Sequence, residues 1–178
     1  MAHVQSYRAG WSRALAVMTW VFAAGGLVST AASGEDTTLL RWAPLLLLVA
    51  AVGWFVYWRP EVRVDEHGVT ISNVARRVVL PWPAVQEVHS RYGLMVETTD
   101  GREWPAWAVP SPVGLQRARA EETEAALMVS QRLERVRGRG ELAGRSDREP
   151  VEVEKDLVAV GALAGLAALA VLAQVLTR

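Results

Sequence analysis

The 178-residue sequence contains no cysteine, which excludes a disulfide-stabilised scaffold, a thiolate metal site and a cysteine nucleophile. Lysine is almost absent as well, because 18 of the 19 basic residues are arginine and the other is Lys155. The 19 basic and 19 acidic side chains cancel, so no global charge attracts nucleic acid and no nucleic-acid partner is expected. The three histidines lie far apart in the sequence.

The motifs of common enzyme classes are also missing. The sequence has no P-loop, no G-x-G-x-x-G and no H-E-x-x-H, and no serine lies in a G-x-S-x-G context. Asp65, Glu66 and His67 alternate in direction if they lie in a strand, so we interpret them as an exposed turn rather than a metal site. His89 is interpreted as a surface or edge histidine. We therefore expect a non-enzymatic protein with no catalytic, cofactor-binding or metal residues.

Long uncharged apolar segments are what the sequence has in excess, and hydrophobic residues make up 51% of it. As helices, residues 14–34 and 157–177 each reach about 31 Å, which spans a bilayer core of about 30 Å. A third segment, residues 39–58, has a similar length. It can span the bilayer if the long Arg41 side chain places its guanidinium group at the membrane–water interface. Tryptophans close to segment ends fit an aromatic belt: Trp11, Trp42, Trp54 and Trp58. The sequence thus predicts three transmembrane helices, at 14–34, 39–58 and 157–177.

Two alternative interpretations apply to these apolar segments. Arg8, Arg13 and the small residues 29–33 fit a signal peptide, but 21 uncharged residues exceed a normal h-region and a second apolar segment follows. A buried helical hairpin in a soluble fold is disfavoured because the rest of the chain is too small to cover three such helices.

Arginine asymmetry predicts the topology. The tail 1–13 carries two arginines, and the segment between the second and third spans carries 14 arginines and Lys155. The short loop at 35–38 carries Glu35 and Asp36 and no basic residue. The positive-inside rule then places the tail and the middle segment in the cytoplasm, and the loop and the C-terminus outside.

In the middle segment, residues 59–156, the spacing of apolar residues changes halfway along. Over 61–109 apolar and polar residues alternate in short runs separated by turn residues, which predicts six strands, with Asp100-Gly101 as a two-residue hairpin turn. Val85 and Val88 are three apart, so a turn or bulge is expected there. Over 115–137 the apolar spacing is helical, with Val129, Leu133 and Val136 on the buried face. Residues 138–156 are polar and turn-rich and predict a flexible tether.

Six short strands followed by one amphipathic helix is the order of a pleckstrin-homology (PH) domain. The sequence resembles the bacterial PH-domain membrane proteins of actinobacteria, of the low-molecular-weight-antigen type, in which two membrane helices precede a small PH-like domain. The resemblance covers about residues 59–109, and the helix more loosely. It is carried by these motifs: Asp65-Glu66-His67-Gly68-Val69, Leu80-Pro81-Trp82 with Val85 and Val88, Arg91-Tyr92-Gly93-Leu94, and Asp100-Gly101-Arg102. It implies an α+β multi-pass protein of the bacterial plasma membrane, with a PH-like β-barrel or split sheet at residues 59–137.

Two features are candidate binding sites. Arg76 and Arg77 form the only adjacent arginine pair, at a predicted corner between strands, and arginine binds phosphate in a bidentate manner, so they are the candidate contact for anionic lipid. A solvated corner is the simpler interpretation, since the middle segment has net charge −2, from 15 basic and 17 acidic residues. Gly161 and Gly165 form a small-xxx-small motif that predicts packing against the other spans, or a homo-oligomer through the third span.

The function predicted from the sequence is therefore the binding of a protein partner, or of anionic lipid, by a PH-like domain at the cytoplasmic face. The alternative is a small subunit of a membrane transport or cell-envelope complex. Transport is disfavoured because the uncharged spans contain few polar side chains. The sequence does not identify the partner.

Overall fold

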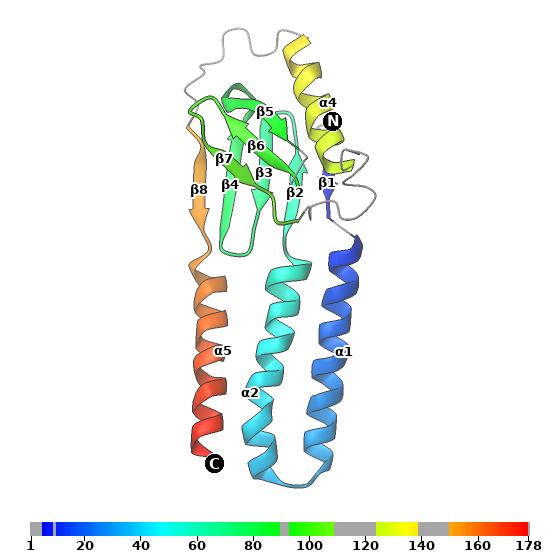
Figure 1. Ribbon diagram of the computed structural model, residues 1–178, viewed down its shortest axis with the longest axis vertical. Helices are drawn as coiled ribbons and strands as arrows, with labels where there is room; N and C mark the ends of the chain where they lie inside the picture. The colour runs from blue at the N-terminus through cyan, green and yellow to red at the C-terminus, as the bar shows by residue number, and fades with distance from the viewer. Residues whose placement is uncertain (1–4, 9, 90–92, 109–123, 139–149, 178) are drawn as a thin grey trace. The chain divides into compact units, whose positions relative to one another are not determined.

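A computed structural model describes residues 5–8, 10–89, 93–108, 124–138 and 150–177 (Figure 1). The chain divides into two compact units. The helical unit comprises Gly10–Arg59 and Asp156–Arg178, and the sheet unit comprises Met1–Ala9 and Pro60–Lys155. The fold is α+β, as predicted.

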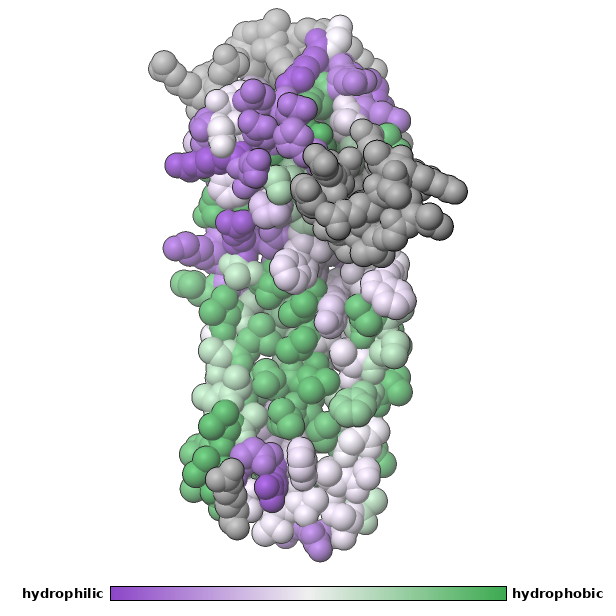
Figure 2. All heavy atoms as spheres, viewed as in Figure 1, coloured by the Kyte–Doolittle hydropathy of each residue, from purple (hydrophilic) through white to green (hydrophobic). Residues whose placement is uncertain are grey.

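The helical unit contains α1 (Gly10–Ala32), α2 (Asp36–Val52), the π-helix η1 (Gly53–Trp58) and α5 (Leu157–Leu176). Three helices in the described residues are long and apolar enough to cross a membrane, with α2 and η1 forming one of them. Figure 2 shows hydrophobic residues over much of their visible face. The prediction of three membrane-spanning helices is therefore supported, with ends that shift by a few residues.

Small residues allow α1 to approach α2 closely. Ala16 and Ala23 are buried, and a Cβ on Gly26 would lie 2.7 Å from a methyl carbon of Leu46. In a membrane the hydrophobic effect does not drive helices together, so close van der Waals packing of this kind supplies much of the association energy. The pattern repeats along α1 at spacings of three and four: Ala16, Thr19, Ala23, Gly26 and Thr30.

A cluster of three tryptophans fixes η1 against α1. The Trp20 ring lies 6.1 Å from that of Trp54 and 5.2 Å from that of Trp58, between centroids. Its indole nitrogen donates to the carbonyl of Ala50 at 3.1 Å. A Cβ on Gly53 would lie within 2.9 Å of that nitrogen, so the close approach requires glycine there. Trp54 and Trp58 are thus packing residues within the helical unit.

The sheet unit contains two antiparallel sheets and one helix, α4 (Glu124–Gly138). The five-stranded sheet has the order β1-β2-β3-β4-β8 and the three-stranded sheet the order β5-β6-β7. The described residues form no closed barrel, which agrees with the split-sheet form of the prediction. The strands are β1 (Gln5–Tyr7), β2 (Glu61–Val64), β3 (Gly68–Ser72), β4 (Arg76–Pro81), β5 (Val85–His89), β6 (Met95–Thr98), β7 (Glu103–Pro105) and β8 (Glu152–Lys155).

The core of the sheet unit lies between the two sheets and α4. Trp82 is fully buried at its centre, and its indole nitrogen donates to the carbonyl of Asp65 at 3.1 Å. From α4, Val129, Leu133 and Val136 enter the core as predicted. The first nine residues of the predicted helix, 115–123, lie outside the described residues.

Two of the strands were not predicted, and both extend the five-stranded sheet. β1 comes from the predicted N-terminal tail and pairs with β2, and β8 comes from the predicted tether and pairs with β4. The tether prediction is therefore wrong for Glu152–Lys155, whose alternation of Glu152 and Glu154 with Val153 suits a strand. Most of the tether, 139–149, lies outside the described residues.

The hairpin between β6 and β7 also differs from the prediction by one residue. Thr98 N–H donates to the carbonyl of Arg102 at 2.9 Å, so three residues form the loop rather than two. Gly101 has φ +75°, the left-handed conformation that closes a three-residue loop after a tight turn. The predicted bulge near Val85 is confirmed, because the register of β5 against β6 shifts between Val85 and Glu87.

Candidate functional site

Arg76 and Arg77 lie at the start of β4 rather than in the corner before it. Successive side chains of a strand point to opposite faces, so the two guanidinium groups diverge. Arg76 lies on the face of the buried Val78 and Leu80, with its guanidinium 5.5 Å from the ring centroid of Trp104. Arg77 is exposed and opposite Glu154 of β8 in the register. The predicted pair is therefore divided, with Arg77 exposed and Arg76 only partly exposed.

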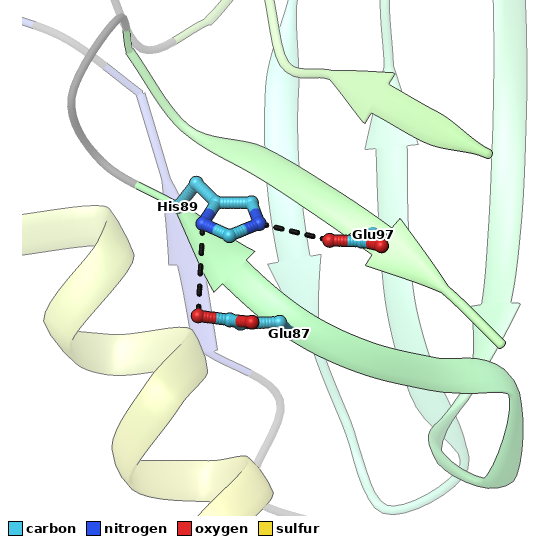
Figure 3. A group of neighbouring side chains, drawn as sticks. All are labelled: Glu87, His89 and Glu97. Carbon is cyan, nitrogen blue, oxygen red and sulfur yellow. Dashed lines mark hydrogen bonds and ion pairs between the residues drawn. The ribbon is translucent and has the colours of Figure 1, made fainter. Parts of the chain in front are cut away.

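A second group of polar residues lies on the outer face of the three-stranded sheet. Figure 3 shows His89 of β5 between Glu87 of the same strand and Glu97 of β6. Its Nε2 lies 3.0 Å from a carboxylate oxygen of Glu97, and its Nδ1 lies 3.8 Å from one of Glu87. Glu103 of β7 is opposite Glu97 in the register, so glutamates from three neighbouring strands follow one another across this face.

This group suits an imidazolium better than a metal ion. One ligand atom from each of Glu87, His89 and Glu97 lies within 4.8 Å of the others, close enough for a metal site to be considered. However, the two carboxylates face different nitrogens of the ring, whereas a metal ion binds a single neutral nitrogen. The hydrogen bond that the ring donates to Glu97 raises the pKa of His89. Burial, the next largest effect, lowers this pKa, and the charges of Glu87, Glu97 and Glu103 raise it, so the net direction is upward. The group is therefore a histidine between carboxylates that favour its protonated form.

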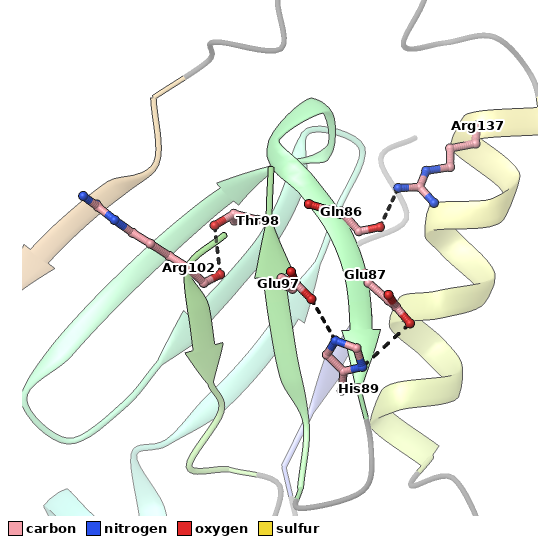
Figure 4. Close-up of polar contacts among 7 residues, drawn as sticks. All are labelled: Gln86, Glu87, His89, Glu97, Thr98, Arg102 and Arg137. Atoms are coloured by element: carbon pink, nitrogen blue, oxygen red, sulfur yellow. Dashed lines mark hydrogen bonds and ion pairs between the residues drawn. The ribbon is translucent and has the colours of Figure 1, made fainter. Parts of the chain in front are cut away.

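The register that assembles this group depends on the bulge in β5. The carbonyl groups of Val85 and Gln86 both accept from the Arg137 guanidinium, at 3.1 and 2.7 Å. Figure 4 shows the bond to Gln86. Arg137 lies in the last turn of α4, so the helix end and the bulge hold each other in place. The sequence predicted the bulge, but it contained no signal that joined the bulge to the end of the helix.

Asn73 connects the two sheets on the other side of the domain. Its side-chain amide donates to the carbonyl of Pro105 at 2.9 Å, and its amide oxygen accepts from the Trp107 N–H at 2.8 Å. These bonds occupy backbone groups at the edge strand β7 and fix the turn that carries Trp107. The Trp107 side chain is 63% exposed, whereas Trp104 is buried. Trp104 lies in β7, and Trp107 lies in the turn that follows it.

Gly161 and Gly165 do not mediate packing within the chain. A Cβ added at either position would meet no atom within 4 Å, so the predicted packing of this motif against the first two spans is wrong. The contacts of α5 with α2 use other residues: Ala159 and Ala170 are buried. The prediction of a homo-oligomer through this face stays a prediction.

The boundary between α5 and β8 is set by Asp156. Its carboxylate accepts from the Ala159 N–H at 2.9 Å, which caps α5, and also pairs with Arg59 at the end of η1. The backbone bond and the arginine together lower the pKa of Asp156. One ion pair thus joins Arg59, which follows η1, to Asp156, which precedes α5.

Comparison with known families identifies the middle of the chain. Residues 59–126 match the family model for the bacterial PH domain. This segment carries a bacterial PH domain. The bacterial PH domain predicted from the sequence is confirmed for these residues, and the PH domain family is generally non-catalytic. No curated protein and no solved structure matches the chain in the corresponding comparisons.

The matched residues begin at Arg59 and end within the first turn of α4. The strands β1 and β8 and most of α4 lie outside the match, although α4 supplies Val129, Leu133 and Val136 to the core. The PH domain of this chain is therefore completed by segments on both sides of the matched residues, each next to a membrane-spanning helix.

Proposed function

We propose that the protein is a non-enzymatic integral membrane protein of the bacterial plasma membrane that presents its PH domain at the cytoplasmic face to bind a protein partner. Two residues, Arg59 and Pro60, separate η1 from β2, and only Asp156 separates β8 from α5. Connections of one or two residues span at most about 7 Å. The domain is therefore joined to two membrane-spanning helices by very short connections, which supports a partner that meets it at the membrane surface.

The observation that carries the proposal is the exposed indole of Trp107. Among the described residues of the PH domain it is the largest side chain with a mostly exposed apolar surface. Its backbone is held by Asn73, so presenting the ring costs little further conformational entropy on binding. Tryptophan is enriched among the residues that dominate protein interfaces, which supports a protein partner for this surface.

Anionic lipid is the runner-up ligand, and the distribution of charge on the described surface gives it less support. The outer face of β5-β6-β7 carries Glu87, Glu97 and Glu103, and an acidic face repels an anionic bilayer. A contact through Arg76 and Arg77 now depends mainly on Arg77. Replacing Arg77 with alanine is expected to weaken the binding of anionic liposomes by several-fold if this corner touches lipid.

Transport is also disfavoured by the use of polar groups in the spans. Thr19 and Thr30 donate to carbonyls of their own helix, and Gln174 bonds to Arg41. Polar groups that line a transport pathway need to be available to the transported solute. Because these three side chains already have hydrogen-bond partners within the protein, they give no support to a transport pathway.

Site-specific photo-crosslinking in intact membranes tests the proposal. A photo-reactive amino acid in place of Trp107 is expected to give a discrete protein adduct, identified by mass spectrometry. The same amino acid at Leu127, which is exposed on α4, is the matched control and is expected to give less of that adduct. Adducts with lipid alone, or equal yields from the two positions, contradict a protein partner at this surface.

A further inference from the structure

A cavity lies between the edge of the five-stranded sheet and α4. It has a volume of about 290 Å³ and is lined by Gln5 of β1, Val64 of β2, and Arg132 and Arg135 of α4. All four residues belong to the sheet unit. We call it the α4–β1 cavity. Two of its walls come from segments beyond the residues that match the PH family, because β1 precedes the match and these arginines follow it.

The two arginines of the cavity have no acidic partner among the described residues, although Arg135 Nε donates to the Gln131 carbonyl of its own helix at 3.2 Å. Among the described residues, no carboxylate oxygen lies within 4.0 Å of a guanidinium nitrogen of Arg132 or Arg135. Other arginines of the sheet unit are engaged: Arg8 and Arg63 with Glu61, Arg102 with Asp100, Arg76 with Trp104, and Arg137 with the β5 bulge. Glu134 is adjacent to Arg135 in sequence, but neighbouring residues of a helix do not face each other.

The spacing of these arginines favours a shared anion. Residues three apart on a helix are neighbours on its surface, so two like charges here repel each other unless an anion lies between them. Val64 is buried, and an apolar wall lowers the local dielectric constant and strengthens a charge interaction in the cavity. The Gln5 side chain can supply a further amide donor from the opposite wall.

We propose that the α4–β1 cavity binds a phosphate group through Arg132, Arg135 and Gln5. Guanidinium groups bind phosphate oxygens through paired hydrogen bonds, which a single lysine could not reproduce. The volume lies just below the range of about 300–1,000 Å³ for drug-sized ligands, which suits a phosphate and its ester oxygen rather than a whole metabolite. The phosphate can belong to a soluble ion or to a lipid headgroup. This site does not depend on the protein partner proposed above.

Titration of the full-length protein in nanodiscs tests the inference. Because the chain lacks cysteine, a single cysteine in place of the exposed Gln131, next to Arg132, can carry an environment-sensitive dye. One arm titrates inorganic phosphate into neutral phosphatidylcholine nanodiscs. The other compares these nanodiscs with discs of equal parts phosphatidylcholine and phosphatidylglycerol. A dye response in the first arm identifies free phosphate as the source, and a response in the second arm alone identifies the lipid headgroup.

Two double variants separate this site from general charge effects. Replacing Arg132 and Arg135 with alanine is expected to weaken the response by about thirtyfold, since each arginine near an anionic group contributes about a factor of five. Replacing Arg77 and Arg102, which are exposed elsewhere on the domain, removes the same charge and should leave the response unchanged. Lysine at both 132 and 135 should restore part of the affinity, which shows that the loss is not due to misfolding.

The inference is overturned by any of three results. The first is the absence of a dye response in both arms. The second is an equal loss in the two double variants, which shows a non-specific charge effect. The third is a loss confined to the Arg77 and Arg102 variant, which places the anion contact at one of these two arginines and not in the cavity.

Discussion

Arg41 and Gln174 exchange two hydrogen bonds between α2 and α5. Arg41 Nε donates to the Gln174 amide oxygen at 2.9 Å, and the Gln174 amide nitrogen donates to the Arg41 carbonyl at 3.1 Å. At the other end of the helical unit, Asp156 pairs with Arg59. These two polar contacts hold α5 against α2 at both ends of an otherwise apolar contact between the helices.

Replacing Gln174 with leucine should loosen this contact. The change removes both hydrogen bonds and leaves the Arg41 guanidinium without its amide partner, at an expected cost of about 1–2 kcal/mol. The measurement is the free energy of unfolding of the full chain in detergent micelles. Thr177→Val is the control, because the Thr177 hydroxyl donates to the Ala173 carbonyl of its own helix. Equal effects of the two changes would show that the contact between helices contributes nothing.

The buried face of α4 gives a second prediction. Leu133 is 5% exposed in the core and Leu127 is 42% exposed on the same helix. Leu133→Ala should destabilise the PH domain by about 2–5 kcal/mol, because it leaves a cavity in a packed core. Leu127→Ala should cost well under about 1 kcal/mol. Hydrogen exchange of peptides from β2 to β4 in the full-length protein measures the difference, and similar exchange rates in the two variants would contradict the docking of α4.

The fold was predictable from the sequence where periodicity was strong. The apolar spans, the six strands of the PH domain and the three core residues of α4 all follow from local alternation or helical spacing. β1 and β8 were not predictable in this way, because runs of three or four residues such as Gln5–Tyr7 and Glu152–Lys155 are too short for alternation to identify a strand. Their strand conformation depends on long-range pairing with β2 and β4.

The candidate sites were harder to predict, because a shift of one or two residues in the start of a strand or in its register changes which side chains lie together. A strand that begins at Arg76 instead of Val78 places Arg76 and Arg77 on opposite faces and removes the predicted pair. Glu97 meets His89 only because the bulge after Val85 shifts the register by one residue. The α4–β1 cavity joins Gln5 to Arg132, residues more than a hundred positions apart, and no local pattern connects them.

The ion pairs of His89 predict a pH dependence. Its pKa is raised in the folded state above the ordinary value of 6.5. The protonated ring therefore contributes stability that is fully present below pH 6.5 and is lost as the pH rises through the folded-state pKa. The effect should stay below about 1 kcal/mol, because the side chain is 39% exposed and solvent screens it.

Unfolding of the PH domain should accordingly become easier as the pH rises above about 6.5 and through the folded-state pKa of His89. His89→Gln should flatten this slope, because glutamine keeps a hydrogen-bond donor but cannot take up a proton. The same change at His67, on an exposed turn away from the three glutamates, is the control. A slope that survives in the His89 variant would show that another group is responsible.

The membrane topology provides the last prediction, and the absence of cysteine makes it directly measurable. We expect the N-terminus and the PH domain in the cytoplasm and the C-terminus outside, because arginine is concentrated in residues 59–156 and the loop between α1 and α2 is acidic. Reporter fusions after Asp36, Gly140 and Arg178 should report outside, inside and outside. A single cysteine at Ser33 should be labelled by an impermeant reagent added to intact cells. A single cysteine at Ser6 should be labelled only after the membrane has been permeabilised. A cytoplasmic signal from the fusion after Arg178 would mean that α5 does not cross the membrane, and labelling of Ser6→Cys in intact cells would invert the whole arrangement.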